Sequence, residues 1–182
     1  MRIGSMPELS QPDPRFHRSF LATTAEVAAA PGGPGPLTRG IIARHGKRWE
    51  SAEGFAALVE ELRGWAEGVR LPPELPVPAT VLWWTEGEEH LGTLFIRHRL
   101  TPALLDHGGH LVASVRPSVR SHGQGKAMLR AALPHAHRLG VDPALLTCAE
   151  SNTASRKVIE ACGGRFEDNR NGSLRYWIRT GA

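Results

Sequence analysis

The segment ASVRPSVRSHGQGKAMLRAAL, residues 113–133, joins the end of a strand to the start of a helix through a basic turn that contains glycines. Apolar and small residues over 110–115 predict a strand, and Arg116-Pro117 ends it. A helical pattern begins at Gln124. The first N–H groups of a helix lack partners within it, and the helix dipole makes that end partly positive. Glycine also lets a backbone approach a phosphate closely, so the segment predicts an anion-binding site.

Two familiar phosphate-binding loops do not match this segment. A P-loop needs four residues between its glycines, whereas Gly123 and Gly125 are separated by one. In a P-loop the lysine is followed by a serine or threonine whose hydroxyl binds Mg²⁺. Here Lys126 is followed by Ala127, so that hydroxyl is missing. A dinucleotide-binding fingerprint needs a third glycine where Met128 stands. The sequence therefore does not predict binding of a nucleoside triphosphate or a dinucleotide here.

The composition is that of a globular protein. The chain has 182 residues, 41% of them hydrophobic and 22% charged, which suits a single domain over 1–182. The net charge of +4 favours anionic partners, but the basic residues are scattered, so nucleic acid is not the expected partner. Cys148 and Cys162 are too few for a disulfide framework and are expected to be reduced and mostly buried. With no signal-like or membrane-spanning stretch, we expect a cytoplasmic protein that does not contact membranes.

The N-terminal part of the chain predicts helices. Residues 1–14 are polar and contain prolines, so we expect them to be poorly ordered. Residues 15–30 have helical character, and PGGPGP at 31–36 predicts a loop. Ser51 is a suitable N-cap for a second helix, in which apolar residues recur at helical spacing. Residues 15–78 thus form the helical N-terminal part of the domain.

From residue 80 onward, the spacing of apolar residues alternates between the two-residue repeat of a strand and the repeat of about 3.6 residues of a helix. Pro134 should kink or end the helix that starts at Gln124, and Gly140 suits the position just after a helix. The order predicts an α/β fold in which a mixed β-sheet is flanked by helices. The expected strands are 80–85, 90–100, 110–115, 144–149, 165–167 and 174–180, and the expected helices are 104–107, 124–139 and 152–162.

Three features resemble one known family. The pattern R-x-x-G-x-G at Arg120, Gly123 and Gly125 resembles the GNAT superfamily of acetyl-CoA-dependent N-acetyltransferases. The helix that opens with NTAS at 152–155 and ends in two glycines is similar to the second motif of that family. The order of strands and helices over 80–180 is also similar. The stretches IRHRL, GGH, VRPS, SRKVIE and RYWI resemble a bacterial group of predicted acetyltransferases.

The resemblance implies acetyl-CoA as the cosubstrate. No metal is expected, because no carboxylate or cysteine completes a ligand set with His107 and His110. The resemblance also implies that backbone N–H groups of the turn hold the pyrophosphate, that the pantetheine lies beside Val115 and that Asn152 contacts it. Arg156 or Lys157 either meets the 3′-phosphate or belongs to a solvated helix face. The implied cofactor-binding residues are Val115, Arg116, Arg120, Ser121, His122, Gly123, Gln124, Gly125, Lys126, Asn152, Ser155 and Lys157.

The catalytic residues are less clearly marked. An acceptor amine with an ordinary pKa near 10.4 must lose a proton, and His110 and Glu150 are the main candidate bases, with His98 nearby. Many family members place a tyrosine, the usual acid, seven residues after the motif asparagine. Ile159 occupies that position here, which leaves Tyr176, the only tyrosine, as the candidate acid.

Two functions remain open at this stage. The first is transfer of the acetyl group of acetyl-CoA to a primary amine, on a small molecule or peptide, by direct attack in a ternary complex. The second is an acyl-CoA-binding regulatory module with little or no activity, which the isoleucine at position 159 suggests. The sequence is also compatible with a homodimer, and it does not identify the amine.

Overall fold

The computed structural model describes residues 6–181 and gives the N-terminal segment a defined place in the sheet. Strand β1 (Glu8–Ser10) pairs antiparallel with β2 (Ala79–Glu86), and Leu9 lies opposite Trp84. The expectation that 1–14 is poorly ordered is therefore wrong for its described part, because this segment satisfies the backbone edge of β2. Residues 1–5 lie outside the described chain.

Three helices follow in the N-terminal part, and the sequence predicted two of them. Ser51 caps α3 as expected, since its Oγ accepts the N–H of Gly54 at 3.0 Å. The sequence interpretation missed α2, which starts at Pro36, the last residue of the expected loop. A proline in the first helical turn is a common start signal because it lacks the N–H that would be unpaired there. The helices are α1 (His17–Ala29), α2 (Pro36–His45) and α3 (Ala52–Gly64).

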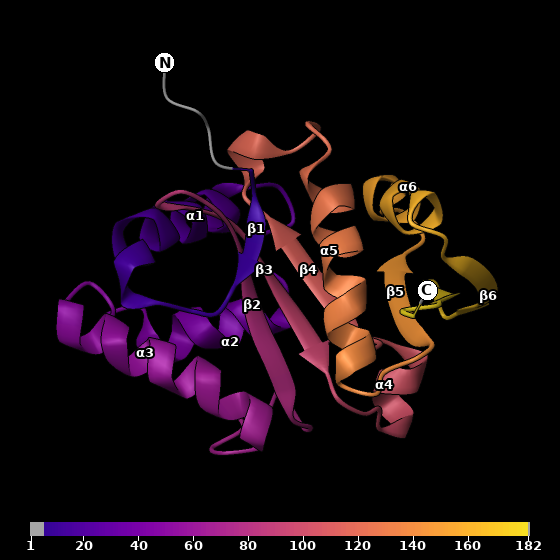
Figure 1. The fold of residues 1–182 in the computed structure, drawn as a ribbon, viewed down its shortest axis with the longest axis horizontal. Coiled ribbons are helices and arrows are strands. Elements are labelled where there is room, and N and C mark those ends of the chain that lie inside the picture. Colours follow the sequence, from indigo (N-terminus) through magenta and orange to yellow (C-terminus); the bar gives the residue numbers. More distant parts are fainter. Residues whose placement is uncertain (1–5, 182) are drawn as a thin grey trace.

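Within residues 6–181, seven strands form two antiparallel sheets that lie side by side (Figure 1). One sheet has the order β1-β2-β3-β4 and the other the order β5-β7-β6. The α/β class with flanking helices predicted from the sequence is confirmed. The sheet expected to be mixed is divided between β4 and β5 into two sheets whose described strand pairs are all antiparallel. The remaining strands are β3 (Glu89–Arg97), β4 (Leu111–Val115), β5 (Ala144–Ala149), β6 (Arg165–Arg170) and β7 (Ser173–Ile178), and the remaining helices are α4 (Pro102–Asp106), α5 (Gln124–Arg138) and α6 (Thr153–Ala161).

Each face of the first sheet builds a separate core, because successive side chains of a strand point to opposite faces. Val81 and Trp83 of β2 pack with the N-terminal helices α1, α2 and α3. Leu82 and Trp84 of the same strand pack with α5, α6 and the second sheet. Figure 1 shows the N-terminal helices on one side of the molecule and α5 and α6 on the other. The sheet thus separates an N-terminal helical layer from the layer that begins at the predicted anion-binding turn.

Helix α5 continues past Pro134 to Arg138, so the predicted early end is wrong. Its buried residues Met128, Leu129, Ala132 and Ala136 lie on both sides of the proline, and their packing holds the helix together. Gly140 has a φ of +76°, which confirms the predicted left-handed position after the helix. Over residues 6–181, no helix combines the length and apolar character needed to cross a membrane.

Replacing Phe55 with alanine should destabilise the N-terminal core. The Phe55 side chain is fully buried, and its ring centroid lies 5.4 Å from that of Phe20. We expect Phe55→Ala to lower the free energy of unfolding by about 3–5 kcal/mol in urea titrations. Phe166 is 57% exposed, so Phe166→Ala is the matched control and should cost less than about 1 kcal/mol. Equal losses for the two variants would contradict this description of the core.

Candidate functional site

Strands β4 and β5 meet only where they begin. The N–H of His110 donates to the carbonyl of Leu145 at 2.7 Å, and a Cβ on Gly109 would lie 2.5 Å from the same oxygen. Within the described residues no further backbone hydrogen bond joins the two strands. The strands are therefore joined at this end and lose their pairing toward Val115 and Ala149; the opening between their edges is called the cleft below.

The turn that follows β4 presents a row of unpaired backbone donors. After a single 3₁₀ turn (Pro117–Val119), the chain takes a left-handed φ of +64° at Ser121 and +78° at Gly123 before α5 begins. In the described structure, no acceptor contacts the N–H groups of residues 121–126, whereas Ala127 donates to Gly123. Successive free N–H groups at a helix N-terminus form a site for an anion. The anion-binding turn predicted from the sequence has this geometry.

The start of α5 is fixed by packing and by one side-chain hydrogen bond. The indole N–H of Trp84 donates to Oε1 of Gln124 at 2.7 Å. A Cβ on Gly125 would lie 3.5 Å from Val158 and 3.9 Å from Val115, so this turn of the helix packs against both α6 and β4. Oε1 of Gln124 thus fixes the start of the helix, and the backbone N–H of Gln124 has no partner within the described residues.

The basic side chains around the turn differ in their availability. The guanidinium of Arg116 pairs with Glu26 at 2.7 Å and with Glu89 at 3.1 Å, which makes it less available to a ligand, and the predicted role of Arg116 in cofactor binding stays a prediction. Arg120 is exposed, and its Nε donates to the carbonyl of Val115 at 2.9 Å, over the end of β4. The side chains of His122 and Lys126 are exposed at the turn itself.

Helix α6 begins beside the open end of the cleft and supplies the second predicted group of residues. Oδ1 of Asn152 accepts the N–H of Ser155 at 3.1 Å, which confirms the N-cap. Arg156 pairs with Glu160 at 3.0 Å on the surface of the helix. Lys157 is exposed and forms no ion pair within the described residues, which makes it the freer cation for a phosphate.

His110 joins the two strands through hydrogen bonds to Leu145. Its Nδ1 accepts the N–H of Leu145 at 2.9 Å, so in the neutral ring the proton lies on Nε2. Burial and the nearby Arg97 lower the pKa of His110 to about 4. Because its one lone pair is already used, this contact argues against His110 as the base, and the catalytic role of His110 stays a prediction. Nε2 of His98 lies 2.8 Å from Oγ1 of Thr80.

Tyr176 is also committed to a structural contact. The phenol is buried on β7 and donates to Oε1 of Glu160 at 3.0 Å. Burial and the carboxylate of Glu160 raise the pKa of Tyr176. The proton of Tyr176 is thus directed at α6, which argues against Tyr176 as the acid, and this role stays a prediction. Ile159, at the position where family members have a tyrosine, is buried in the core. The thiol of Cys148 is buried as expected, and burial raises its pKa.

A polar pocket of about 240 Å³ lies at the end of β5 and was not foreseen from the sequence. It is lined by Asp106, His107, Ala149 and residues 170–173 of the turn between β6 and β7. Nδ1 of His107 lies 3.1 Å from Oγ of Ser173, which leaves its Nε2 exposed. Glu150 follows β5 directly, is exposed, and forms no side-chain hydrogen bond or ion pair within the described chain.

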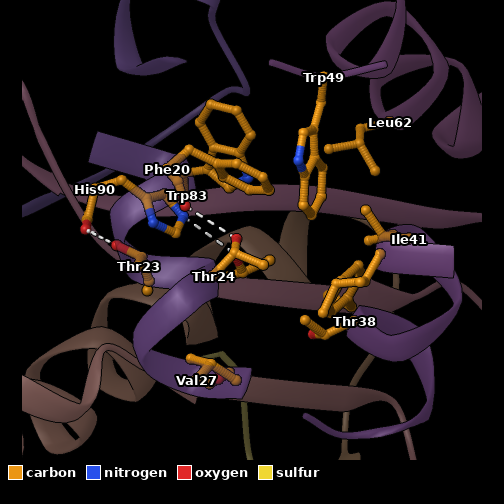
Figure 2. A pocket seen from close by; sticks show the side chains of 15 residues that line it. Phe20, Thr23, Thr24, Val27, Thr38, Ile41, Trp49, Leu62, Trp83 and His90 are labelled. Atoms are coloured by element: carbon orange, nitrogen blue, oxygen red, sulfur yellow. Dashed lines mark hydrogen bonds between the residues drawn. The ribbon is translucent and has the colours of Figure 1, made fainter. Parts of the chain in front are cut away.

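A second, smaller cavity of about 30 Å³ lies between the sheet and the helices α1 and α2. Figure 2 shows His90, Phe20 and Trp83 on one side of it and Trp49, Leu62 and Ile41 on the other. Burial and the nearby Arg116 lower the pKa of His90 to about 3, so this ring is neutral. The volume suits about two water molecules, which is too small for a whole acceptor.

The comparison with known families identifies the class of this protein. The family model described as "Acetyltransferase (GNAT) domain" matches residues 8–165. The chain therefore belongs to the GNAT acetyltransferase family, which supports acyl transfer as its class of reaction and acetyl-CoA as its cosubstrate. No curated protein matches the sequence.

Solved structures agree on the fold at low sequence identity. RimJ of Mycobacterium smegmatis, in complex with CoA-disulfide, is 18% identical with a TM-score of 0.62 and covers 97% of this chain and 86% of its own. The acetyltransferase of Salmonella typhimurium that modifies the N-terminal serine of ribosomal protein L7/L12 is 12% identical with a TM-score of 0.56. This match covers 93% of this chain and 91% of the Salmonella chain. The microcin C7 self-immunity acetyltransferase MccE, in complex with acetyl-CoA and AMP, is 11% identical with a TM-score of 0.57. This match covers 94% of this chain and 91% of MccE.

Variants of His110 separate a structural role from a catalytic one. Asparagine can place an amide oxygen near the position of Nδ1, so we expect His110→Asn to keep the Leu145 contact and most of the acetyl transfer. His110→Ala leaves the buried N–H of Leu145 unpaired and should lower the free energy of unfolding by about 1–3 kcal/mol. Thermal unfolding and coenzyme A release measure the two effects. A loss of about 10²-fold or more in His110→Asn, at unchanged stability, would restore the assignment as a base.

Proposed function

We propose that the protein transfers the acetyl group of acetyl-CoA to a primary amine by direct attack in a ternary complex. The observation that carries this proposal is the row of free N–H groups over 121–126, which lies where the cleft between β4 and β5 opens. Pyrophosphate would accept hydrogen bonds from this row, with the helix dipole of α5 and the exposed side chain of Lys126 adding positive charge.

The edge of β4 supplies the groups for the pantetheine and the thioester. The backbone N–H of Arg116 donates to the carbonyl of Leu91 on β3. Backbone groups alternate in direction along an antiparallel pair, so the N–H groups of Ala113 and Val115 point away from β3 and toward the cleft. Their N–H groups are donors for the amide carbonyls of the arm and for the oxyanion that develops on the acetyl carbonyl. Asn152, at the start of α6, faces the same end of the cleft.

Proton removal falls to the residues at the end of β5. Nδ1 of His110 is occupied, whereas the carboxylate of Glu150 and Nε2 of His107 are unused within the described residues. His107 lines the pocket beside Ala149, and Glu150 directly follows Ala149 in the chain. An amine would approach the thioester here, from the side opposite α5 and α6. The alternative, a module that binds acyl-CoA without turnover, is supported by one observation: Tyr176 and Ile159 provide no acid in the cleft.

Replacing Gly123 tests the anion site through charge alone. Asparagine and aspartate both tolerate a left-handed backbone, and a Cβ at Gly123 would contact nothing within 4 Å. We expect Gly123→Asp to weaken acetyl-CoA binding in calorimetry by about tenfold or more relative to Gly123→Asn, because the carboxylate repels the pyrophosphate. Equal affinities in the two variants would contradict a phosphate site at this turn.

A panel of amines tests whether the protein is an active transferase. We expect thiol release from acetyl-CoA in the presence of at least one polyamine, amino acid, aminoglycoside or peptide with a free amine. The double variant His107→Gln with Glu150→Gln should lower turnover by about 10²-fold and leave acetyl-CoA affinity unchanged. Tight binding of acetyl-CoA without turnover on any amine would instead support the regulatory module.

A further inference from the structure

A stripe of polar residues on α1 connects this helix to the segments that flank the cofactor site. Ser19, Thr23 and Glu26 follow one another at helical spacing, so they lie on one face of α1. Thr23 donates to the carbonyl of His90 at 2.7 Å, and Ser19 donates to the carboxylate of Glu89 at 2.7 Å. The first two residues thus attach α1 to the start of β3, and the third reaches the segment after β4.

Glu26 holds both the side chain and the backbone of that segment. Its Oε1 accepts from Nε of Arg116 at 2.7 Å, and its Oε2 accepts from the backbone N–H of Ser118 at 3.0 Å. A carboxylate that accepts two hydrogen bonds at once fixes the position and direction of both donors. Figure 1 shows the segment after β4 close to α1, beyond the upper end of α5. One residue of the N-terminal layer therefore supports the chain three residues before Ser121, where the free N–H row begins.

We propose that Glu26 is a positioning residue for acetyl-CoA binding, which acts through Arg116 and Ser118 to hold the pyrophosphate turn ready for its ligand. The inference rests on the proposed function, since it assumes that residues 121–126 bind the pyrophosphate. The turn contains left-handed residues and no regular hydrogen-bonded ladder, so ordering it at the moment of binding would cost affinity. A turn that is already ordered avoids this cost. The apparent affinity for a ligand scales with the fraction of molecules whose turn is in the binding conformation, so ordering the turn in advance raises that affinity.

Charge alone predicts the opposite effect, which makes the proposal testable. A carboxylate near an anion site repels the anion, so its removal should tighten binding if electrostatics were its only influence. We expect Glu26→Gln to weaken coenzyme A binding in calorimetry by about tenfold, because the amide cannot accept from both Arg116 and Ser118. Affinity equal to or tighter than that of the wild type would overturn the proposal.

Glu89→Gln is the matched control. It removes the same charge from the same arginine, but Glu89 does not contact the backbone of the turn. We expect this variant to bind coenzyme A as tightly as the wild type or slightly more tightly. An equal loss of affinity in both variants would overturn the proposal, since it would show that the charge on Arg116, not the bond to Ser118, is decisive.

Hydrogen exchange measured by mass spectrometry tests the same idea without any ligand. We expect Glu26→Gln to exchange faster than the wild type over 116–123, with unchanged protection of α3 and a similar melting temperature. Unchanged exchange over 116–123 would overturn the proposal even if coenzyme A affinity fell. Failure of the wild type to bind coenzyme A would count against the proposed function, whereas the exchange data would still report whether Glu26 orders the turn.

Discussion

The contact between His110 and Leu145 is the constraint on which the site depends. Two hydrogen bonds, one from each backbone N–H, join the strands at their first residues. Beyond this point the twist of each sheet carries β4 and β5 apart, because no ladder holds them together. The fold thus contains a cleft whose walls are strand edges with unpaired backbone groups. A sheet edge inside a domain normally needs a covering partner, and an extended ligand with amide groups can supply one.

The division of the sheet also explains why two hydrophobic cores are present. Trp83 and Trp84 are neighbours on β2, yet each is buried in a different core. The core around Trp83 holds the N-terminal helices, and the core around Trp84 holds α5 and α6. Trp84 additionally binds Gln124 at the first turn of α5. Packing on one face of the sheet therefore sets the position of the helix N-terminus that carries the proposed anion site.

Local signals account for the features that the sequence predicted correctly. The turn at Gly123 and the cap at Asn152 are both set within a few residues, and so are most strand and helix positions from residue 79 onward. The α/β class followed from their order. Helix α2 was missed although Pro36 marks its start, because the preceding glycines and prolines favoured a longer loop. Strand β1 depends on pairing with β2, about seventy residues away, which no local pattern reveals.

Long-range contacts also bear on the predicted site residues. His110 was placed correctly at the start of β4, but only the neighbouring strand determines whether its lone pair is free. Arg116 stands in a basic turn and looked available for a phosphate, whereas its partner Glu26 comes from a helix ninety residues earlier. The role of a polar side chain depends on its long-range partners, and the sequence shows the residue type without them.

The proposed site consists mainly of backbone groups. In the proposed complex, the donors for the phosphates and the thioester are N–H groups of the turn and of β4, which every residue type except proline supplies. Side chains act one step away: Gln124 and Glu26 fix the positions of those groups. Such a site places few demands on side-chain identity, which is consistent with the shared fold at 11–18% identity. Acceptor specificity must then reside elsewhere, and the pocket formed by α4 and the turn between β6 and β7 offers the side chains for it.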